Sequence, residues 1–337
     1  MVAVALFLGA GGAYVAESRG DTPSPYVATA QPVSITPTAG TLVTPQPAAR
    51  DVTPYEGYGT WVDVFDFSPP YAGTNPSVTP EDLDEMAAAG VRTVYLQAAR
   101  LDDRSPDGLE DPWLLAEFVL RAEQLGIEIV AWYLPKFPGD GTDEDRLAQM
   151  SDYEVLGRRF DGIGVDIEWT QGSDDETRSA RLVELSATAA AADPDTPLGA
   201  IVLPPVLIEV VNTAYWPGFP WAEIAPHYDV WLPMSYWSFR TQSSGYQDGY
   251  TYNEESIRRL RNNINDPEAL VHAIGGIGGI DGIDDPENPE EPLASIDDFE
   301  GFLASLDDTN SIGGSIYDWA TLDEAARARL AELFSAG

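Results

Sequence analysis

Residues 160–169 read FDGIGVDIEW, and this segment has the pattern of a buried β-strand. Isoleucine and valine recur at every second position, as in a buried β-strand whose side chains point alternately to opposite faces. The face opposite these branched residues carries two carboxylates, Asp166 and Glu168. Removing a carboxylate from water is costly. A buried strand that keeps two of them on one face therefore predicts a chemical site at its end.

Short apolar runs and amphipathic helical segments alternate around this stretch, from Tyr58 to the C-terminus. Strands are predicted over residues 60–67, 91–99, 127–135, 160–169, 197–204, 229–237, 269–278 and 311–319. Helices are predicted over residues 79–90, 112–125, 174–192, 253–263, 295–308 and 321–334, with a further helical stretch that reaches about Arg159. Eight strands, each followed by a helix or a long loop, predict an α/β fold of the (β/α)8 TIM barrel type.

A doubly wound open sheet is the alternative fold. Such a sheet usually places a glycine-rich phosphate loop after its first strand, and the segment FDFSPPYAG at residues 65–73 is not one. In a barrel, active sites lie where the strands end and the following loops begin. We therefore expect the functional side chains at the carboxyl ends of the predicted strands.

The composition excludes several classes of function. The formal net charge is -38, so the chain repels phosphate backbones and anionic lipid, and nucleic-acid binding is excluded. We interpret the acidity as a source of solubility. With no cysteine, disulfides, thiolate catalysis and thiolate zinc sites are excluded. The only histidines are His227 and His272, which leaves little for a histidine-based metal site or catalytic triad. We predict no metal and no other cofactor. We also expect a monomer.

The N-terminal region differs from the rest of the chain. Residues 1–20 are mainly apolar and about the length of a signal-peptide core, so we expect a signal peptide or membrane anchor. Residues 21–57 are rich in Pro, Thr, Ala and Ser, which predicts a disordered linker. Residues 58–337 form the predicted barrel domain. This order predicts a secreted or cell-surface protein, with a tether to the membrane or cell envelope if the leader is retained.

Polar and aromatic side chains gather where the predicted strands end. The candidate substrate-binding residues are Asp63, Trp132, Tyr133, Trp169, Met234, Trp237, Tyr317, Asp318 and Trp319. Nearby strand ends also carry Asp66, Gln97, Arg100, Lys136 and Arg240. Aromatic rings stack on the apolar faces of sugars, and carboxylates supply acid and base catalysis in glycosidases. The pattern predicts a carbohydrate site.

The two acids of residues 160–169 predict a particular chemistry. One ionised carboxylate raises the pKa of a second beside it, so Glu168 can stay protonated near neutral pH and act as a general acid. The alternative is that Asp166 and Glu168 form ion pairs with Arg or Lys inside the barrel.

Three segments resemble the family-18 glycoside hydrolases, the chitinases and their relatives. The strand-four signature of that family is Asp-Gly-x-Asp-x-Asp-x-Glu, and this chain has DGIGVDIE at 161–168, with Gly164 in place of the middle Asp. The family's Met-x-Tyr-Asp becomes MSYW at 234–237, and its Gly-Gly followed by Trp is matched by Gly313, Gly314 and Trp319.

The resemblance implies a TIM barrel in which Glu168 is the general acid. It also implies that Asp166 orients the substrate's N-acetyl group, that Tyr236 donates a hydrogen bond to the same group, and that Trp319 floors the sugar subsite. The carbonyl oxygen of the N-acetyl group would attack the anomeric carbon, with retention of configuration. Gly164 and Trp237 replace two acids of the family pattern, which favours either a glycosidase with another substrate or a barrel that binds glycans without cleaving them.

Other interpretations stay open from the sequence. Asp63 or Asp318 could be the nucleophile partner of Glu168 in a two-acid glycosidase, or Asp318 could simply cap the end of its strand. A metal-dependent hydrolase that uses the acidic cluster is a weaker alternative. The aromatic segment YWPGFPW at 215–221 is either a glycan platform or a lid that packs on the barrel rim. The acidic segment 281–292 lacks the ligand spacing of a calcium loop, so we interpret it as a solvated loop.

Overall fold

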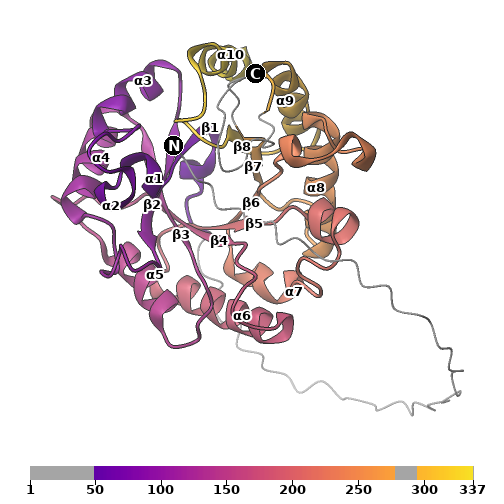
Figure 1. Cartoon of the computed structure of the whole chain (residues 1–337), viewed down its shortest axis with the longest axis horizontal. Helices are drawn as coiled ribbons and strands as arrows, with labels where there is room; N and C mark the ends of the chain where they lie inside the picture. Colours follow the sequence, from indigo (N-terminus) through magenta and orange to yellow (C-terminus); the bar gives the residue numbers. More distant parts are fainter. Residues whose placement is uncertain (1–48, 278–293, 337) are drawn as a thin grey trace, which may run out of the picture. The chain divides into compact units, whose positions relative to one another are not determined.

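The computed structural model describes residues 49–277 and 294–336, and they form a closed barrel of parallel strands (Figure 1). The strands are β1 (Gly57–Val62), β2 (Thr93–Arg100), β3 (Glu128–Leu134), β4 (Gly162–Ile167), β5 (Leu198–Val202), β6 (Val230–Pro233), β7 (His272–Gly275) and β8 (Gly313–Ile316). Each strand pairs with its sequence neighbours, and β1 pairs with β8. Bridges from Trp231 to Val271 and from Met234 to Ile274 join β6 to β7 and close the ring.

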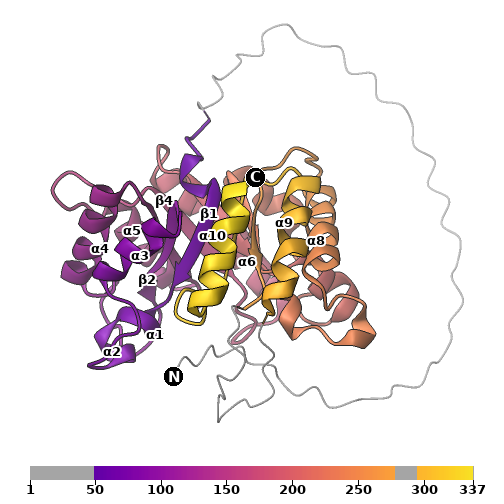
Figure 2. The same cartoon turned by 90° about the horizontal axis from the view of Figure 1, so that it is seen from above.

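Helices form the outer layer, and Figure 2 shows α9 and α10 lying alongside the strands. The longer helices are α3 (Leu83–Ala88), α4 (Pro112–Leu125), α5 (Thr142–Asp152), α6 (Asp175–Ala192), α8 (Gly249–Asn263), α9 (Phe299–Asp308) and α10 (Glu324–Ala336). Short helices α1 (Val64–Phe67), α2 (Pro69–Ala72) and α7 (Trp221–Ile224) lie in the loops. The fold is the predicted (β/α)8 TIM barrel.

Two predicted elements end earlier than the sequence pattern suggested. The first strand was expected to reach residue 67, but β1 ends at Val62 because Asp63 begins helix α1. The Asp63 side chain accepts the backbone N–H of Phe65, and the Asp66 side chain accepts the backbone N–H of Asp63. This reciprocal capping stabilises a helical turn at residues 63–67, so the chain does not continue as a strand there. Similarly, α5 ends at Asp152 and does not reach Arg159.

Tyr55 fills the floor of the barrel, at the amino ends of the strands. It is fully buried, and its hydroxyl donates to the backbone oxygens of Ile163 and Pro197 at 2.8 and 3.2 Å. A Cβ built on Gly162 or Gly199 would meet the Tyr55 ring within 3.0 Å. The two glycines on β4 and β5 therefore leave the space that this ring occupies.

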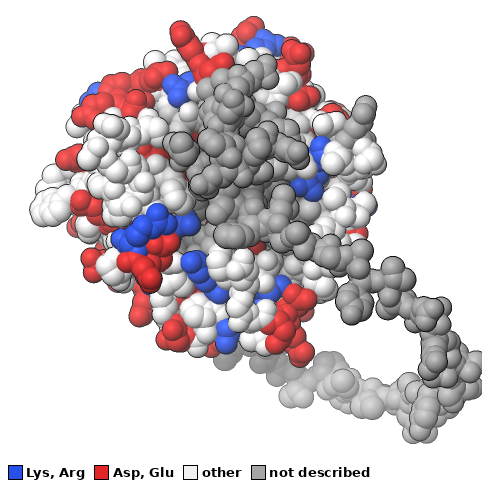
Figure 3. Space-filling view, viewed as in Figure 1, with Lys and Arg blue, Asp and Glu red and all other residues white. Residues whose placement is uncertain are grey.

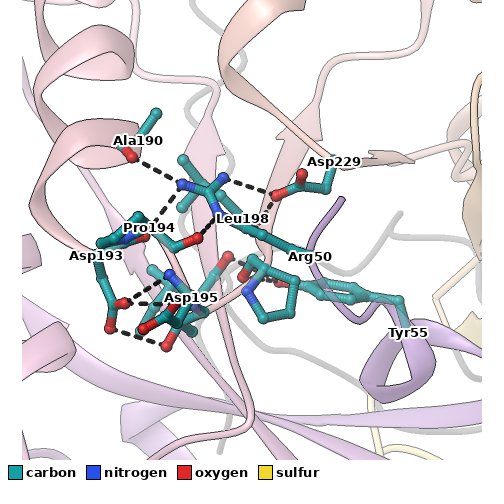
Figure 4. A network of polar contacts seen from close by, with 11 residues as sticks. Arg50, Tyr55, Ala190, Asp193, Pro194, Asp195, Leu198 and Asp229 are labelled. Carbon is teal, nitrogen blue, oxygen red and sulfur yellow. Dashed lines mark hydrogen bonds and ion pairs between the residues drawn. The ribbon is translucent and has the colours of Figure 1, made fainter. Parts of the chain in front are cut away.

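Arg50 fixes the start of the packed chain to the same end of the barrel (Figure 4). Its guanidinium forms an ion pair with Asp229 at 2.9 Å and donates to the backbone oxygens of Ala190 and Asp193 at the end of α6. A cation that binds the last carbonyls of a helix stabilises its C-terminus. The packed part of the chain therefore includes Arg50, which precedes the expected start of the barrel domain at residue 58.

Aromatic rings fill the interior above this floor. Trp61 stacks on Tyr95 with ring centroids 4.3 Å apart, and Trp132 meets Trp61 edge to face at 5.8 Å. His272 is fully buried between the backbone oxygen of Tyr55 and the Ser315 hydroxyl. The interior of the barrel is thus a packed core.

The predicted leader at residues 1–20, most of the predicted linker at 21–57, and the acidic segment 281–292 lie outside the described residues. Within residues 49–277 and 294–336, no helix has the length and apolar character that crossing a membrane requires.

Candidate active site

Strand β4 brings the carboxylate pair to the mouth of the barrel, at the carboxyl ends of the strands. Gly162 and Gly164 face the interior, where their neighbours are the side chains of Tyr55 and Trp132, so Asp166 and Glu168 continue the inward-facing row. Asp166 is 5% exposed, and Glu168, just after the strand, is partly exposed.

Burial sets the electrostatics of this pair. It raises the pKa of Glu168 to about 7, although the nearby Arg100 guanidinium lowers it. Burial, and then the Glu168 carboxylate, raise the pKa of Asp166 well above its ordinary value. Two interacting carboxylates titrate as a unit, so the pair retains a proton at neutral pH. No described Arg or Lys forms an ion pair with either acid, which disfavours the interpretation of Asp166 and Glu168 as a structural ion pair.

Tyr236, in the loop after β6, lies among the acids of the mouth. Burial, and then the carboxylates of Glu168, Asp166, Asp318 and Asp63, raise the pKa of Tyr236 well above its ordinary value. The Tyr236 hydroxyl therefore keeps its proton and can only be used as a neutral donor or acceptor. The four acids come from the ends of β1, β4 and β8, and the sequence predicted all of them.

The acids after β1 and β8 are held by the protein itself. Asp63 accepts the Tyr317 hydroxyl at 2.7 Å, and the Asp318 carboxylate accepts the backbone N–H of Thr321 at 2.9 Å. Burial, and then the negative charge of Asp63, raise the pKa of Asp318 to about 7. Asp318 is thus both a cap for the turn after β8 and a member of the acidic group.

Asp63, Asp66 and Asp318 are the described residues that could hold a metal ion, because each offers an oxygen within 4.8 Å of the others. Both oxygens of Asp63 and both of Asp66 already accept hydrogen bonds from the protein. Their geometry is explained by the capping of α1, and no metal is needed to account for it.

Several aromatic residues face the mouth. Tyr317 lies 5.9 Å from Tyr236 between ring centroids. Trp169 is partly exposed after β4, with the Lys136 ammonium 4.7 Å from its ring centroid. Tyr215 lies close enough to the carboxylates of Glu168 and Asp166 that burial and their charge raise the pKa of Tyr215 to about 12.

Other candidate binding residues lie away from the mouth. The Tyr133 hydroxyl donates to Asp143 of α5, so this ring faces the outer helices. Trp237 is 1% exposed and packs near Phe302 of α9, with ring centroids 5.6 Å apart. Trp319 is also 1% exposed, and the guanidinium of Arg327 lies 4.1 Å from its ring centroid. The structure therefore does not bring these three rings to the carboxylate pair.

Two further candidates contribute to the walls of the interior. Trp132 is 5% exposed and donates its indole N–H to the backbone oxygen of Tyr95, which places it below the acids. Met234 is buried beside the bridge to Ile274 that closes the barrel.

Gly164 has a packing explanation. A Cβ at this position would lie 2.9 Å from the Ile201 side chain and 3.2 Å from the Cβ of Trp132. The space that the middle Asp of the family-18 signature would need is therefore occupied by an isoleucine and an indole. Asp166 consequently has Glu168 as its acidic neighbour on the strand, without a second carboxylate below it.

The aromatic segment 215–221 forms mainly a lid. Trp216, Phe219 and Trp221 are buried, and their rings contact one another in sequence. Only Tyr215 turns toward the acids. No pattern in the sequence separates Tyr215 from the packed rings beside it, so sequence reasoning did not identify it individually.

Comparison with known proteins adds information on the fold. No model of a known protein family matches the sequence, and no curated protein is similar to it. Solved structures are similar. An endo-1,4-β-D-mannanase from Thermotoga petrophila has a TM-score of 0.59 and 10% identity, over 84% of this chain and 100% of that one.

Family-18 glycoside hydrolases are also among the similar structures. An N-acetylglucosaminidase of family 18 from Paenibacillus barengoltzii has a TM-score of 0.54 and 11% identity, over 84% of this chain and 100% of that one. A family-18 chitinase from Cycas revoluta has a TM-score of 0.54 and 13% identity, over 83% and 99%. The chain shares its fold with glycoside hydrolases. At such low identity the likeness concerns the barrel, and the chemistry must be argued from the side chains.

Proposed function

We propose that this protein is a glycoside hydrolase in which Glu168 is the general acid. The observation that carries the proposal is the convergence of Asp166, Glu168 and the Tyr236 hydroxyl at the mouth of a closed barrel. A general acid works best when its pKa is near the operating pH, and burial raises the pKa of Glu168 to about 7.

The arrangement favours a substrate-assisted route. Asp166 is buried, and its Oδ1 accepts no hydrogen bond from any described residue, so it can accept the N–H of a substrate acetamido group. Tyr236 keeps its proton and can donate to the acetamido carbonyl. Glu168 gives its proton to the glycosidic oxygen as the C–O bond breaks, while the acetamido oxygen bonds to the anomeric carbon. Water then opens this intermediate, with the Glu168 carboxylate as base and with retention of configuration.

A two-acid mechanism with Asp63 or Asp318 as nucleophile has less support. Both oxygens of Asp63 accept hydrogen bonds, from the Phe65 amide and the Tyr317 hydroxyl. One oxygen of Asp318 accepts from Thr321, and the other is buried. Asp63 is held through both oxygens and Asp318 through one, whereas Asp166 accepts no hydrogen bond from a described residue through either oxygen.

The second candidate function is binding of a glycan without cleavage. It is favoured by Gly164 and Trp237, which stand where the family-18 pattern has acids. Trp237 is buried against α9, so a packed indole stands at this position where the family pattern has a carboxylate.

The test is hydrolysis of N-acetylated and plain oligosaccharides by the parent protein and by Glu168→Gln. We expect the parent to cleave an N-acetylated probe and the variant to lose about 10²–10⁴ in kcat with binding retained. Glu123→Gln is the matched control, because Glu123 pairs with Arg158 on the outer surface of α4. Cleavage of plain hexosides alone would exclude the substrate-assisted route, and binding without any cleavage would support the second candidate.

A further inference from the structure

The cations of the mouth stand out in a strongly acidic chain. Acidic side chains are spread around the barrel face in Figure 3, and Lys and Arg form only small groups. Most described Arg side chains are ion-paired. Within residues 49–277 and 294–336, the Arg and Lys side chains with neither an ion pair nor a hydrogen bond are Arg92, Arg100, Lys136 and Arg240. Three of these four lie at the carboxyl ends of strands, around the acids.

Arg100 and Lys136 lie near each other because β2 and β3 pair, with Arg100 opposite Leu134, two residues before Lys136. Burial, and then the Arg100 guanidinium, lower the pKa of Lys136. The Nε of Arg100 is buried without a partner among the described residues. Two cations held close together repel each other, and a shared anion relieves that repulsion.

No neighbouring acid among the described residues forms an ion pair with Arg100 or Lys136. Burial raises the pKa of Asp63, Asp166 and Glu168, and the Arg100 guanidinium opposes this rise, so it lies near all three acids, but it is ion-paired with none of them. Asp102 forms its ion pair with Arg104, and Asp143 accepts the Tyr133 hydroxyl. Asp102 and Asp143 are thus committed elsewhere, while Asp103 is exposed to solvent and forms no ion pair with a described residue.

Each of these two cations makes a cation–π contact with an aromatic ring. The Arg100 guanidinium lies 5.0 Å from the Phe65 ring centroid, and the Lys136 ammonium lies 4.7 Å from that of Trp169. Such contacts stabilise a cation while leaving its N–H groups available. A partly exposed indole beside an ammonium group also suits a sugar that carries a negative substituent, because the ring binds its apolar face.

We propose that Arg100 and Lys136 bind an oxyanion on the sugar next to the acetamido sugar, so that the substrate is an acidic, N-acetylated glycan. This inference rests on the proposed function for the position of the acetamido group. The oxyanion is a carboxylate or an ester sulfate, since both accept hydrogen bonds from guanidinium and ammonium groups.

The test measures binding to the Glu168→Gln protein by titration calorimetry. One probe is an oligosaccharide of alternating glucuronate and N-acetylglucosamine, and its neutral match is the same compound with methyl-esterified carboxylates. We expect the acidic probe to bind roughly tenfold or more tightly than the ester. Arg100→Gln and Lys136→Gln should each abolish most of this preference, and Arg100→Lys should retain part of it.

Arg92→Gln is the matched control. Arg92 also has no ion pair or hydrogen bond to a described residue, but it lies at the opposite end of the barrel, just before β2. It changes the net charge of the protein equally, so a general effect of charge would appear in both variants. A sulfated chitin oligosaccharide tests the other source of the oxyanion, and preference for it over neutral chitin would assign the site to ester sulfates.

Equal binding of charged and neutral probes in both series, or an equal loss in Arg92→Gln, would overturn the inference. Failure of the proposed function looks different: the parent would cleave no probe while the preference for the acidic one persisted. Conversely, cleavage of neutral chitin without any preference for charge would leave the hydrolase intact and remove the oxyanion subsite.

Discussion

The floor and the mouth of the barrel both bury polar groups, but in opposite ways. At the floor, His272 is enclosed by the backbone oxygen of Tyr55 and the Ser315 hydroxyl, and burial lowers the pKa of His272 to about 4. At the mouth, Asp166 and Asp318 are also buried, yet each has an oxygen without a partner among the described residues. At the floor, the buried imidazole is hydrogen-bonded at both nitrogens. At the mouth, buried carboxylates keep oxygens that accept no hydrogen bond from a described residue.

The difference has opposite consequences for stability. His272 is neutral when folded, so protons bind preferentially to the unfolded chain between pH 6.5 and 4, and the free energy of unfolding falls as the pH falls through this window. Burial raises the pKa of Glu168 from 4.5 to about 7, so protons bind preferentially to the folded chain between these values. Its contribution to stability therefore falls as the pH rises. Acid therefore destabilises the folded chain through His272 at the floor, and alkali destabilises it through Glu168 at the mouth.

The largest expected effect is at the floor. Tyr55→Ala should lower the free energy of unfolding by about 3–5 kcal/mol, because it leaves a cavity between Gly162 and Gly199 and removes two hydrogen bonds. Urea denaturation measures this change. The remaining folded molecules should keep their kcat. Tyr55→Phe is the control and should cost only about 1 kcal/mol. If Tyr55→Ala lowered kcat without lowering the free energy of unfolding, the floor would contribute directly to activity at the mouth.

Gly164→Asp tests the packing of β4 between the floor and the acids of the mouth. It restores the family-18 signature, but the new side chain would meet Ile201 and Trp132, and its charge would be buried. We expect a loss of about 2–4 kcal/mol in the free energy of unfolding and no gain in activity. Combined with Ile201→Ala, which makes room for the new side chain, the loss of stability should be smaller than the sum of the losses in the two single variants. An unaltered denaturation midpoint for Gly164→Asp would show that this space is not filled.

The sequence predicted the barrel and its acids because both follow from local patterns. The alternation in 160–169 places Asp166 and Glu168 on the inward face, and that period does not depend on the neighbouring strands. Strand β1 shows the limit. The apolar run to residue 67 looks like a continuing strand, but the capping of α1 by Asp63 and Asp66 ends it at Val62.

The sequence did not predict which aromatic rings point into the mouth of the barrel. Tyr133, Trp237 and Trp319 stand at strand ends like Tyr236 and Tyr317, yet they pack against outer helices. After a strand ends, the loop conformation and residues distant in the sequence decide whether a ring faces the mouth or the outer helices. The Arg327 of α10 that covers Trp319 is one such partner.

Glu168→Gln should have an effect on stability opposite in sign to its effect on activity. Removing this partly desolvated charge should raise the free energy of unfolding by about 1–3 kcal/mol at pH 8, where the folded Glu168 is ionised. The gain should vanish below about pH 4.5, where the acid is protonated in both states. Denaturation of both proteins at pH 4.5, 6 and 8 measures the difference. An equal gain at every pH would indicate that the charge of Glu168 is not its cause.

The smallest expected effect concerns the tuning of the acid pair. Arg100 lowers the pKa of Glu168, so Arg100→Gln should raise this pKa and move the alkaline limb of the kcat/KM profile upward by a fraction of a pH unit. A neutral N-acetylated probe is needed, because it makes no use of the guanidinium in binding. Arg92→Gln, at the floor end of the same strand, should leave the limb in place. If both variants move the limb equally, the mouth responds to the overall charge of the protein and not to Arg100.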